Sequence, residues 1–559
     1  DDAVYLKTSA CCKHFAAYSI EKGRFSFDAV IPDPRDLADT YFPAFKSCVT
    51  RSRVSGFMCS YNAINGVPAC TNKWLLTDVL RTQWRFEGYV VSDCDGMLYA
   101  LKRHKYTKSL VDTVAKGMAA GMELDCGTVY NARNVAKALE DGLISEDDMD
   151  HVLRRLFTIL FRLGYFNPLQ ALPAWASLNN SLVNIPPHQR LALDAARQGL
   201  VLLKNAAATL PWDPARIRRL AVVGPSSNIT RAMQGNYYGG APYLITPLQG
   251  LQAYVPDVYF VKGCTPADDT ETDIAAAEAA AAGADATVLF VGISGTQERE
   301  NHDRSDIGLP GAQDLLIDRV SRAAKGPVAL VLISGSSVDV SAAHDSAHVG
   351  AMLWAGYPGQ SGGRAIADVL FGRYSPAGRL PVTFHFANYT QEVDFHDMNM
   401  RPNASATHPG RTYRFYRRPV LYPFGHGLSY TSFAYAMRCP TDVPFATAAR
   451  DLQATRRTPH EAAVVASVTV HVRNTGARPS DHVVLLFVAA PGAGTDGAPA
   501  KTLAAFERVR VEVGLRETVE LGLTSHHFSL ASPESGRFAV RRGPWAVTVG
   551  DELCTITVK

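Results

Sequence analysis

Four short apolar segments near the N-terminus each end in polar or ionisable residues. The segments are SACCKHF, SGFMCSYN, GYVVSDCD and GMELDCG, and their polar ends are His14, Asn62, Asp93 and Asp125. Patterns typical of helices lie between and after them, over residues 36–49, 109–120 and 146–163. Polar groups at the carboxyl ends of successive parallel strands form the active face of a (β/α) barrel. This spacing therefore predicts barrel-type strand–helix units.

The predicted barrel is incomplete. A complete (β/α)8 barrel needs eight units and about 250 residues, whereas residues 1–165 supply four units. We therefore expect the C-terminal half of a barrel, with an unpaired strand edge and an open core. We also expect this sequence to be a fragment, or to be completed by a separate N-terminal barrel segment. On its own, the chain is then expected to be poorly active.

The rest of the chain predicts a linker at residues 166–189 and a second α/β domain at 190–385. Continuous apolar runs there (LAVVGP, ATVLFVGI, VALVLISG and GAMLWAG) are typical of parallel strands covered on both faces. Residues 386–440 are rich in aromatic side chains and lack periodicity, which indicates a connecting segment packed over other domains. Short alternating strands separated by turns predict a β-sandwich at residues 441–559.

Composition narrows the function classes. The 559 residues carry a net charge of +3 with scattered basic residues, so we expect no nucleic-acid partner. No apolar run reaches eighteen residues, so no membrane span is predicted. The ten cysteines lack metal-site spacing, and two pairs suit disulfides, Cys59 with Cys70 and Cys439 with Cys554.

Asparagine sequons accompany these cysteines. Together the two features predict a secreted, extracellular glycoprotein, and the alternative is a cytosolic protein with reduced cysteines. The four sequon residues are Asn179, Asn228, Asn388 and Asn403.

Asp93 is the strongest catalytic candidate in the first region, because it follows the buried strand YVVS and is expected at the barrel mouth. From position alone, a role as the cap of the next helix is equally consistent. Lys13 and His14 stand at another strand end, where they are candidates to bind sugar hydroxyls. From the residues alone, an ordinary solvated surface pair is the stronger interpretation of these two.

A second group of charged residues lies in the loop at 294–311, directly after the strand ATVLFVGI. Such a loop is usually a solvated surface, but loops after parallel strands also carry catalytic groups. Glycosidases need two carboxylates, and two domains that meet at a cleft can each supply one. The charged candidates in this loop are Glu298, Glu300, Asp303 and Arg304.

Ordered motifs along nearly the whole chain resemble those of glycoside hydrolase family 3, and of its β-xylosidase-like branch in particular. The resemblance implies a barrel, then an α/β sandwich, then a fibronectin-III-like domain. The matching motifs are KHFAAYS, GFMCSYNAINGVPAC, GYVVSDCDG, GMELDCG, LLKN, QGNYYG, ERENHDR with LPG, WAGYPGQSGGRAIADVLFG, GRTYRFY and YPFGHGLSYT.

The resemblance also assigns roles. Asp93 corresponds to the nucleophile, and Glu300 corresponds to the acid/base, with Glu298 as the alternative for that role. The implied reaction is a retaining double displacement that needs no metal or organic cofactor. The residue that follows Asp93 is Cys94, and a cysteine at this position is similar to the xylosidase-like members of the family. By the same resemblance, the residues expected to contact substrate are Lys13, His14, Tyr61 and Glu298.

The expected substrate is β-linked xylose at the non-reducing end of a xylan-type oligosaccharide or cell-wall polysaccharide, with arabinose as a second sugar. A β-glucosidase is the alternative within the family. A non-catalytic carbohydrate-binding or scaffold relative is a second alternative, because an Asp and an Arg of the family's sugar subsite are absent with the first half of the barrel. A third is a serine esterase, since G-x-S-x-G occurs around Ser361.

Overall fold

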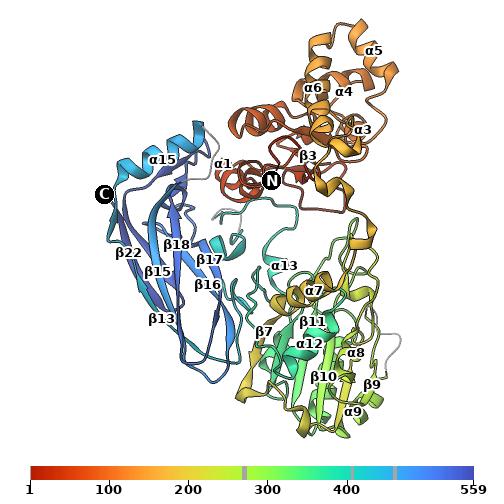
Figure 1. The fold of residues 1–559 in the computed structure, drawn as a ribbon, viewed down its shortest axis with the longest axis vertical. Coiled ribbons are helices and arrows are strands. Elements are labelled where there is room, and N and C mark those ends of the chain that lie inside the picture. The colour runs from red at the N-terminus through yellow and green to blue at the C-terminus, as the bar shows by residue number, and fades with distance from the viewer. Residues whose placement is uncertain (1, 267–272, 404–407, 458–462) are drawn as a thin grey trace.

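The computed structural model describes residues 2–266, 273–403, 408–457 and 463–559. Figure 1 shows three bodies: a red and orange N-terminal region, a yellow and green α/β domain, and a blue β-sandwich, with a teal segment between them. The predicted fold class is confirmed. The chain combines a partial barrel, an α/β domain and an all-β domain.

The N-terminal region contains a three-stranded parallel sheet in the order β1-β3-β6. These strands are β1 (Cys11–Phe15), β3 (Gly56–Cys59) and β6 (Tyr89–Ser92). The fourth predicted strand, GMELDCG, forms only a single bridge from Leu124 to Val91, so its assignment as a full strand was wrong. Glu123 explains the departure from ladder pairing, since its buried carboxylate accepts from the Val90 amide at 2.6 Å.

The predicted helix at 36–49 is broken, because Pro43 cannot donate the backbone hydrogen bond that a continuous helix needs. Its pieces are α1 (Pro34–Asp36), the π-helix η1 (Leu37–Tyr41) and α2 (Pro43–Thr50). The other two predicted helices are present. Ser109 caps the first, and Ser145 and Asp148 form a capping box on the second. These two helices are α4 (Leu110–Ala120) and α6 (Glu146–Arg162), and the region also contains η3 (Trp74–Gln83), α3 (Gly96–Lys102) and α5 (Ala132–Glu140).

The α/β domain is built on a six-stranded sheet in the order β7-β12-β11-β10-β8-β9, in which only the edge strand β7 is antiparallel to its neighbour. All seven residues of β10 are buried because both faces of the sheet are covered. Leu289 packs into one apolar core and Val288 into the other. The strands are β7 (Val201–Asn205), β8 (Arg219–Val223), β9 (Asp257–Val261), β10 (Ala286–Gly292), β11 (Val328–Ile333) and β12 (Ala351–Trp354).

Helices line both faces of this sheet. Helices α9 and α10 pack against the core that contains Leu289. Helices α8 and α12 pack against the core that contains Val288. The carboxyl ends of the parallel strands therefore open at one edge of the sheet, where ligands bind in such folds. The helices are α7 (Pro186–Gly199), α8 (Pro247–Gln252), α9 (Ile274–Ala282), α10 (Gln313–Ala323), α11 (Ser341–Asp345) and α12 (Gly362–Leu370).

The C-terminal body pairs a three-stranded sheet, β13-β15-β18, with a five-stranded sheet, β14-β22-β21-β16-β17. Alternate residues of β15 are buried, as the sequence pattern predicted. Its first strand, β13 (Phe433–Arg438), precedes residue 441, the expected start of this domain. The other strands are β14 (Asp442–Val443), β15 (Val464–Asn474), β16 (Ser480–Ala489), β17 (Thr502–Val511), β18 (Arg516–Thr524), β21 (Gly543–Val549) and β22 (Glu552–Val558), and α15 is Phe445–Arg457.

Within the part of the chain that the structure describes, three disulfides lie in the N-terminal region and one in the C-terminal body. The predicted pairs Cys59–Cys70 and Cys439–Cys554 are both present. Cys12–Cys48 and Cys94–Cys126 were not predicted, and both lie in the N-terminal region. Cys94–Cys126 joins the residue after Asp93 to the segment after Leu124, so it ties together two neighbouring ends at the barrel mouth.

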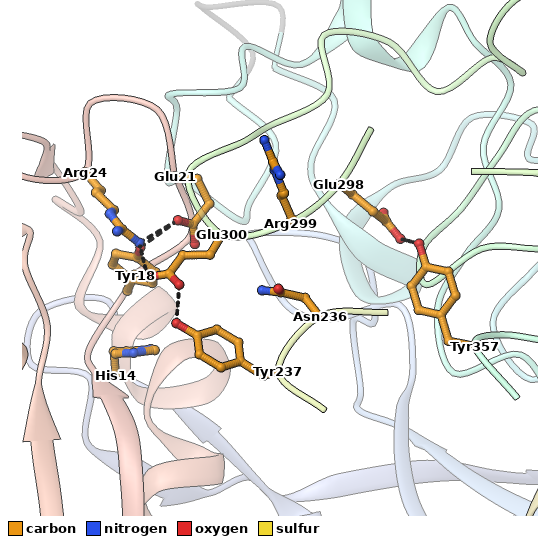
Figure 2. Close-up of a pocket in the computed structure, with 10 residues that line it drawn as sticks. All are labelled: His14, Tyr18, Glu21, Arg24, Asn236, Tyr237, Glu298, Arg299, Glu300 and Tyr357. Carbon is orange, nitrogen blue, oxygen red and sulfur yellow. Dashed lines mark hydrogen bonds and ion pairs between the residues drawn. The ribbon is translucent and has the colours of Figure 1, made fainter. Parts of the chain in front are cut away.

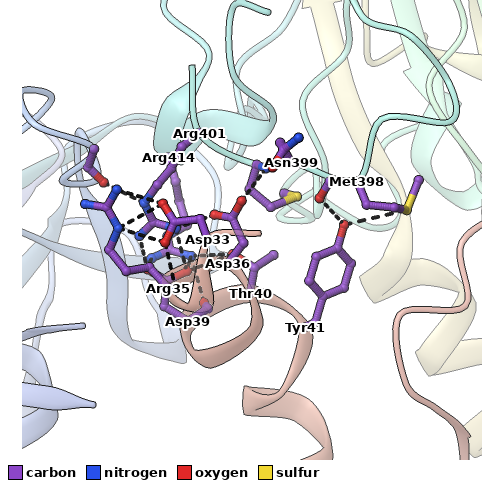
Figure 3. A network of polar contacts seen from close by, with 12 residues as sticks. Asp33, Arg35, Asp36, Asp39, Thr40, Tyr41, Met398, Asn399, Arg401 and Arg414 are labelled. Carbon is purple, nitrogen blue, oxygen red and sulfur yellow. Dashed lines mark hydrogen bonds and ion pairs between the residues drawn. The ribbon is translucent and has the colours of Figure 1, made fainter. Parts of the chain in front are cut away.

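Buried ion pairs and hydrogen bonds join the N-terminal region and the β-sandwich through the connecting segment (Figure 3). The Arg401 guanidinium binds the carboxylates of Asp36 and Asp39, and its Nε donates to the Gly497 carbonyl at 2.9 Å. Arg414 donates to the Asp39 carbonyl at 2.8 Å. Because these partners come from the barrel region, the connecting segment and the sandwich, the cluster fixes how these two bodies pack.

The second half of α6 carries an exposed apolar stripe. Leu153, Phe157 and Phe161 lie one turn apart on the same face, and Phe161 is 58% exposed. Phe166, just beyond the helix, packs against the last two of these rings. Exposed apolar patches of this kind mark candidate interaction surfaces.

Replacing Arg401 by leucine is expected to destabilise the chain by about 3–5 kcal/mol, because it strands the Asp36 carboxylate, which is 1% exposed, without its cation. Calorimetric unfolding measures the effect. Arg322→Leu is the matched control, since its partner Asp318 is solvated, and its cost should stay within about 0.5 kcal/mol. Equal melting curves for the two variants would contradict a role for the buried cluster.

Candidate active site

Asp93 lies directly after β6, at the carboxyl end of the barrel sheet. Its Oδ1 accepts from the Cys94 amide at 2.8 Å, and its side chain is 14% exposed. Asp93 is not the residue that caps the following helix. That position belongs to Asp95, whose backbone is left-handed at φ 64°. The structure thus gives Asp93 no role as a helix cap and leaves its carboxylate partly exposed.

Two of the residues that the sequence singled out, His14 and Tyr61, interact with Asp93. His14 Nε2 lies 3.4 Å from Asp93 Oδ2. Burial lowers the pKa of His14, although the Asp93 carboxylate opposes this shift. Burial and then the Asp93 carboxylate raise the pKa of Tyr61, which keeps its hydroxyl protonated as a hydrogen-bond donor. Lys13 is exposed, and its ammonium lies 5.0 Å from the centre of the Tyr237 ring.

Glu300 reaches the barrel from the other domain, on the loop after β10. This loop is fixed to the segment after β1: Asp303 accepts from the backbone amides of Glu21 and Lys22, at 3.0 and 2.7 Å. In return, the Asn301 amide donates to the Glu21 carboxylate at 2.9 Å. These cross-domain hydrogen bonds place Glu300 over the barrel mouth.

Both oxygens of Glu300 accept hydrogen bonds. Arg24 donates to Oε1 at 3.0 Å, and the Tyr237 hydroxyl donates to Oε2. The Tyr237 hydrogen bond is the larger cause of a lowered Glu300 pKa, and Arg24 adds to it. Glu300 is therefore ionised in the empty site, with a side chain that is 37% exposed.

Arg24 is the buried centre of this arrangement. Its Nη1 donates to Tyr18 and Glu21 as well as to Glu300, at 2.9, 2.8 and 3.0 Å. Its guanidinium also lies 5.1 Å from the centre of the Tyr61 ring. Burial opposes the charge, but the hydrogen bonds to Tyr18 and Glu300 outweigh burial and raise the pKa of Arg24.

Glu298 points away from this group, toward Tyr357 (Figure 2). Its Oε1 accepts from the Tyr357 hydroxyl at 2.6 Å and from the Gly335 amide at 2.9 Å. Ser336 donates to Oε2, and Arg304 lies 3.8 Å from the same oxygen. Gly335 permits this packing, because a Cβ there would lie 2.6 Å from Glu298 Oε1. All these partners belong to the α/β domain.

A pocket of about 370 Å³ opens between the two domains (Figure 2). The barrel side and the α/β side both supply polar groups and aromatic rings, which suits a sugar with hydroxyls on its rim and C–H groups on its faces. Its lining residues are His14, Tyr18, Glu21, Arg24, Asn236, Tyr237, Glu298, Arg299, Glu300 and Tyr357.

Several lining residues had no assigned role in the sequence. Tyr237 lies inside the motif QGNYYG and Tyr357 inside WAGYPG. Both motifs indicated the family resemblance but assigned no role to these tyrosines. Tyr18 lies inside the motif KHFAAYS in the same way. Arg24 gave no signal, because its importance comes from a contact with Glu300, which lies 276 positions away.

Two polar strand ends serve the structure instead of the site. Asn62 donates to the carbonyls of Ala16 and Ala63, and Asp125 accepts from the amides of Val129 and Tyr130. Ser361 is 4% exposed at the start of α12, which is unsuited to an esterase nucleophile.

Among residues 2–266, 273–403, 408–457 and 463–559, no group of three His, Cys, Asp or Glu side chains is arranged to hold a metal ion. Over the same residues, no helix has the length and apolar character needed to cross a bilayer.

Family models match the chain in three places. The model of the glycosyl hydrolase family 3 N-terminal domain matches residues 6–159, and that of the C-terminal domain matches residues 200–430. A fibronectin type III-like domain model matches residues 482–552. Probable beta-D-xylosidase 7 of Arabidopsis thaliana is 40% identical over 573 residues, which covers 99% of this chain and 74% of that protein.

The chain belongs to glycosyl hydrolase family 3.

Two further family members are similar to it. Beta-xylosidase/alpha-L-arabinofuranosidase 2 of Medicago sativa subsp. varia is 41% identical over 522 residues, covering 91% of this chain and 66% of that protein. A solved structure, a family 3 exo-beta-xylosidase (XlnD) in complex with a xylobiose aziridine activity-based probe, superposes with a TM-score of 0.92 at 34% identity. It covers all of this chain, and this chain covers 73% of it. The family predicted from the motifs is thus confirmed, and with it a glycosidase.

Proposed function

We propose that this glycosidase is a retaining exo-β-xylosidase that releases xylose from the non-reducing ends of xylan-type oligosaccharides. Asp93 and Glu300 come from two domains and are linked through His14, which lies 3.4 Å from Asp93 and lines the same polar pocket as Glu300, and this arrangement carries the proposal. The xylosidase names of the similar proteins support the choice of sugar. The name of the Medicago protein supports α-L-arabinofuranosides as second substrates.

Asp93 is assigned as the nucleophile. Its carboxylate attacks the anomeric carbon while Glu300 gives a proton to the departing oxygen, so the glycosidic bond breaks as the bond to Asp93 forms. Glu300 then removes a proton from water, which attacks the same carbon and releases both the sugar and Asp93. His14, Lys13 and Tyr61 are assigned to the sugar hydroxyls, because His14 and Tyr61 lie beside Asp93 and Lys13 lies against the pocket-lining ring of Tyr237.

Glu300 is assigned as the acid/base in preference to Glu298. Both line the pocket, but the Glu298 oxygens are occupied by Tyr357, Gly335 and Ser336 of its own domain. Glu300 is the one that reaches the barrel side, through Arg24. Glu298 remains a proposed substrate contact that also orients Tyr357.

Variants at the two carboxylates test the mechanism. Asp93→Ala should lower kcat by roughly 10⁴-fold or more, and Glu300→Ala by about 10²–10⁴-fold for a xylobiose substrate. Azide should restore turnover of a nitrophenyl xyloside in Glu300→Ala and give the β-xylosyl azide, because a small anion replaces the missing base. Glu298→Ala is the matched comparison. Azide rescue of that variant, and not of Glu300→Ala, would exchange the two assignments.

The sugar itself is tested with a panel of nitrophenyl glycosides. The proposal expects the highest kcat/KM for β-D-xyloside, followed by α-L-arabinofuranoside. A preference for β-D-glucoside would replace the proposal with the β-glucosidase alternative. No turnover of any glycoside by a form with a complete barrel would favour the carbohydrate-binding alternative.

We also propose that the exposed α6 stripe and the open edge of the barrel sheet bind a further (β/α) barrel segment. The chain alone should be poorly active, and co-expression with the N-terminal barrel segment of a relative should raise kcat/KM on the order of tenfold or more, because the sugar is then held from both sides. Phe157→Glu with Phe161→Glu should remove the gain, while Leu191→Glu on α7 should keep it. Equal rates with and without the segment contradict this proposal.

The chain is further proposed to be a secreted glycoprotein. Four disulfides support an oxidising compartment, and the asparagines of all four sequons are exposed. Expressed through a secretory pathway, the protein should lose mass on treatment with an N-glycosidase, with the glycans mapped to those asparagines by peptide mass spectrometry. An unchanged mass would count against this localisation.

A further inference from the structure

If Glu300 is the acid/base, as the proposed function has it, its protonation state must change during the reaction. An acid/base must hold a proton in the first step and lose it in the second. In the empty site, two donors, Arg24 and Tyr237, each bind one Glu300 oxygen. Both favour the carboxylate, which suits only the second step.

The two donors differ in how readily they can leave. Arg24 is 6% exposed, is bound to Tyr18 and Glu21, and keeps its positive charge. Glu300 Oε1 therefore faces a fixed cation and cannot carry the catalytic proton. Oε2 is the oxygen that remains for proton transfer.

Tyr237, by contrast, is 74% exposed and lies on the loop of the QGNYYG motif. Its hydroxyl is neutral, since the Glu300 hydrogen bond raises the pKa of Tyr237 to about 12. The Lys13 ammonium lies 5.0 Å from the centre of the Tyr237 ring, and in Figure 2 the Tyr237 hydroxyl points toward Glu300. An exposed hydroxyl can give up its acceptor to a ligand at little cost.

We infer that Tyr237 is a positioning residue that holds Glu300 as a carboxylate in the empty site and yields Oε2 to the leaving-group oxygen when substrate binds. When the Tyr237 hydroxyl leaves, Oε2 takes up a proton from solvent, and in the first step the glycosidic oxygen, now beside Oε2, receives that proton. Once the leaving group has departed, the hydroxyl donates to Oε2 again. It then stabilises the base that takes a proton from water.

The other charged groups around Glu300 stay the same when only this hydroxyl is removed. Lys13 from β1 and Arg24 from the following segment favour the carboxylate, and Glu21 and Asp93 have the opposite sign. Tyr237→Phe changes none of these charges and keeps the ring. Any change in Glu300 titration in that variant is therefore due to the hydroxyl.

Carbon NMR of protein labelled at the glutamate carboxyl carbons tests the inference directly. Glu300→Gln identifies the Glu300 signal by its loss. A lost donor to the carboxylate raises the carboxyl pKa, so the titration midpoint in Tyr237→Phe should lie about half to one pH unit above that of the unaltered protein. Tyr238→Phe is the matched control, and its midpoint should not move. Equal midpoints in the Tyr237→Phe and unaltered proteins would overturn the inference.

Kinetics supply a second measurement. The basic limb of kcat/KM reports the group that must be protonated in the free enzyme, so it should move to higher pH in Tyr237→Phe by the same amount. A shift in kcat at every pH with an unmoved limb would mean that Tyr237 is merely structural. If Asp93→Ala keeps activity, the proposed function fails, but the carbon titration still decides the role of Tyr237.

Discussion

The buried guanidinium of Arg24 is the contact on which the site depends. It binds Tyr18 and Glu21 of the barrel region and Glu300 of the α/β domain with one nitrogen. A cation with so little exposure needs these acceptors, because a buried charge without partners costs several kcal/mol. The buried Arg24 charge requires the Glu300 carboxylate as a partner. This ion pair thus holds the loop at residues 294–311 over the barrel mouth.

The three candidate carboxylates, Asp93, Glu298 and Glu300, differ in their hydrogen-bond partners. Asp93 sits among Tyr61, His14 and a backbone amide, at the end of a strand held by the Cys94–Cys126 disulfide. Glu300 is shared between two domains, whereas Glu298 is bonded only within its own. Rigid placement suits a nucleophile, and a carboxylate with one exchangeable donor suits a group that must alternate between acid and base.

The sequence predicted what depends on local pattern. Buried strands such as β10 were evident as apolar runs, and the motifs identified the family and singled out the two carboxylates proposed as catalytic. The broken helix around Pro43 and the single bridge at Leu124 were missed, since apolar periodicity does not report backbone pairing. Arg24 and Tyr237 were missed for another reason. Their roles arise from contacts between distant segments, which one sequence does not encode as a local pattern.

The central claim is that Asp93 and Glu300 act on the same sugar from opposite domains. The most direct measurement is a crystal structure of the enzyme trapped with a 2-deoxy-2-fluoro-β-xyloside that carries a good leaving group. The account predicts a covalent bond from the anomeric carbon to Asp93, with the Glu300 carboxyl about 5 Å from that of Asp93. A sugar bound covalently to another residue, or a Glu300 side chain turned into a different pocket, would contradict it.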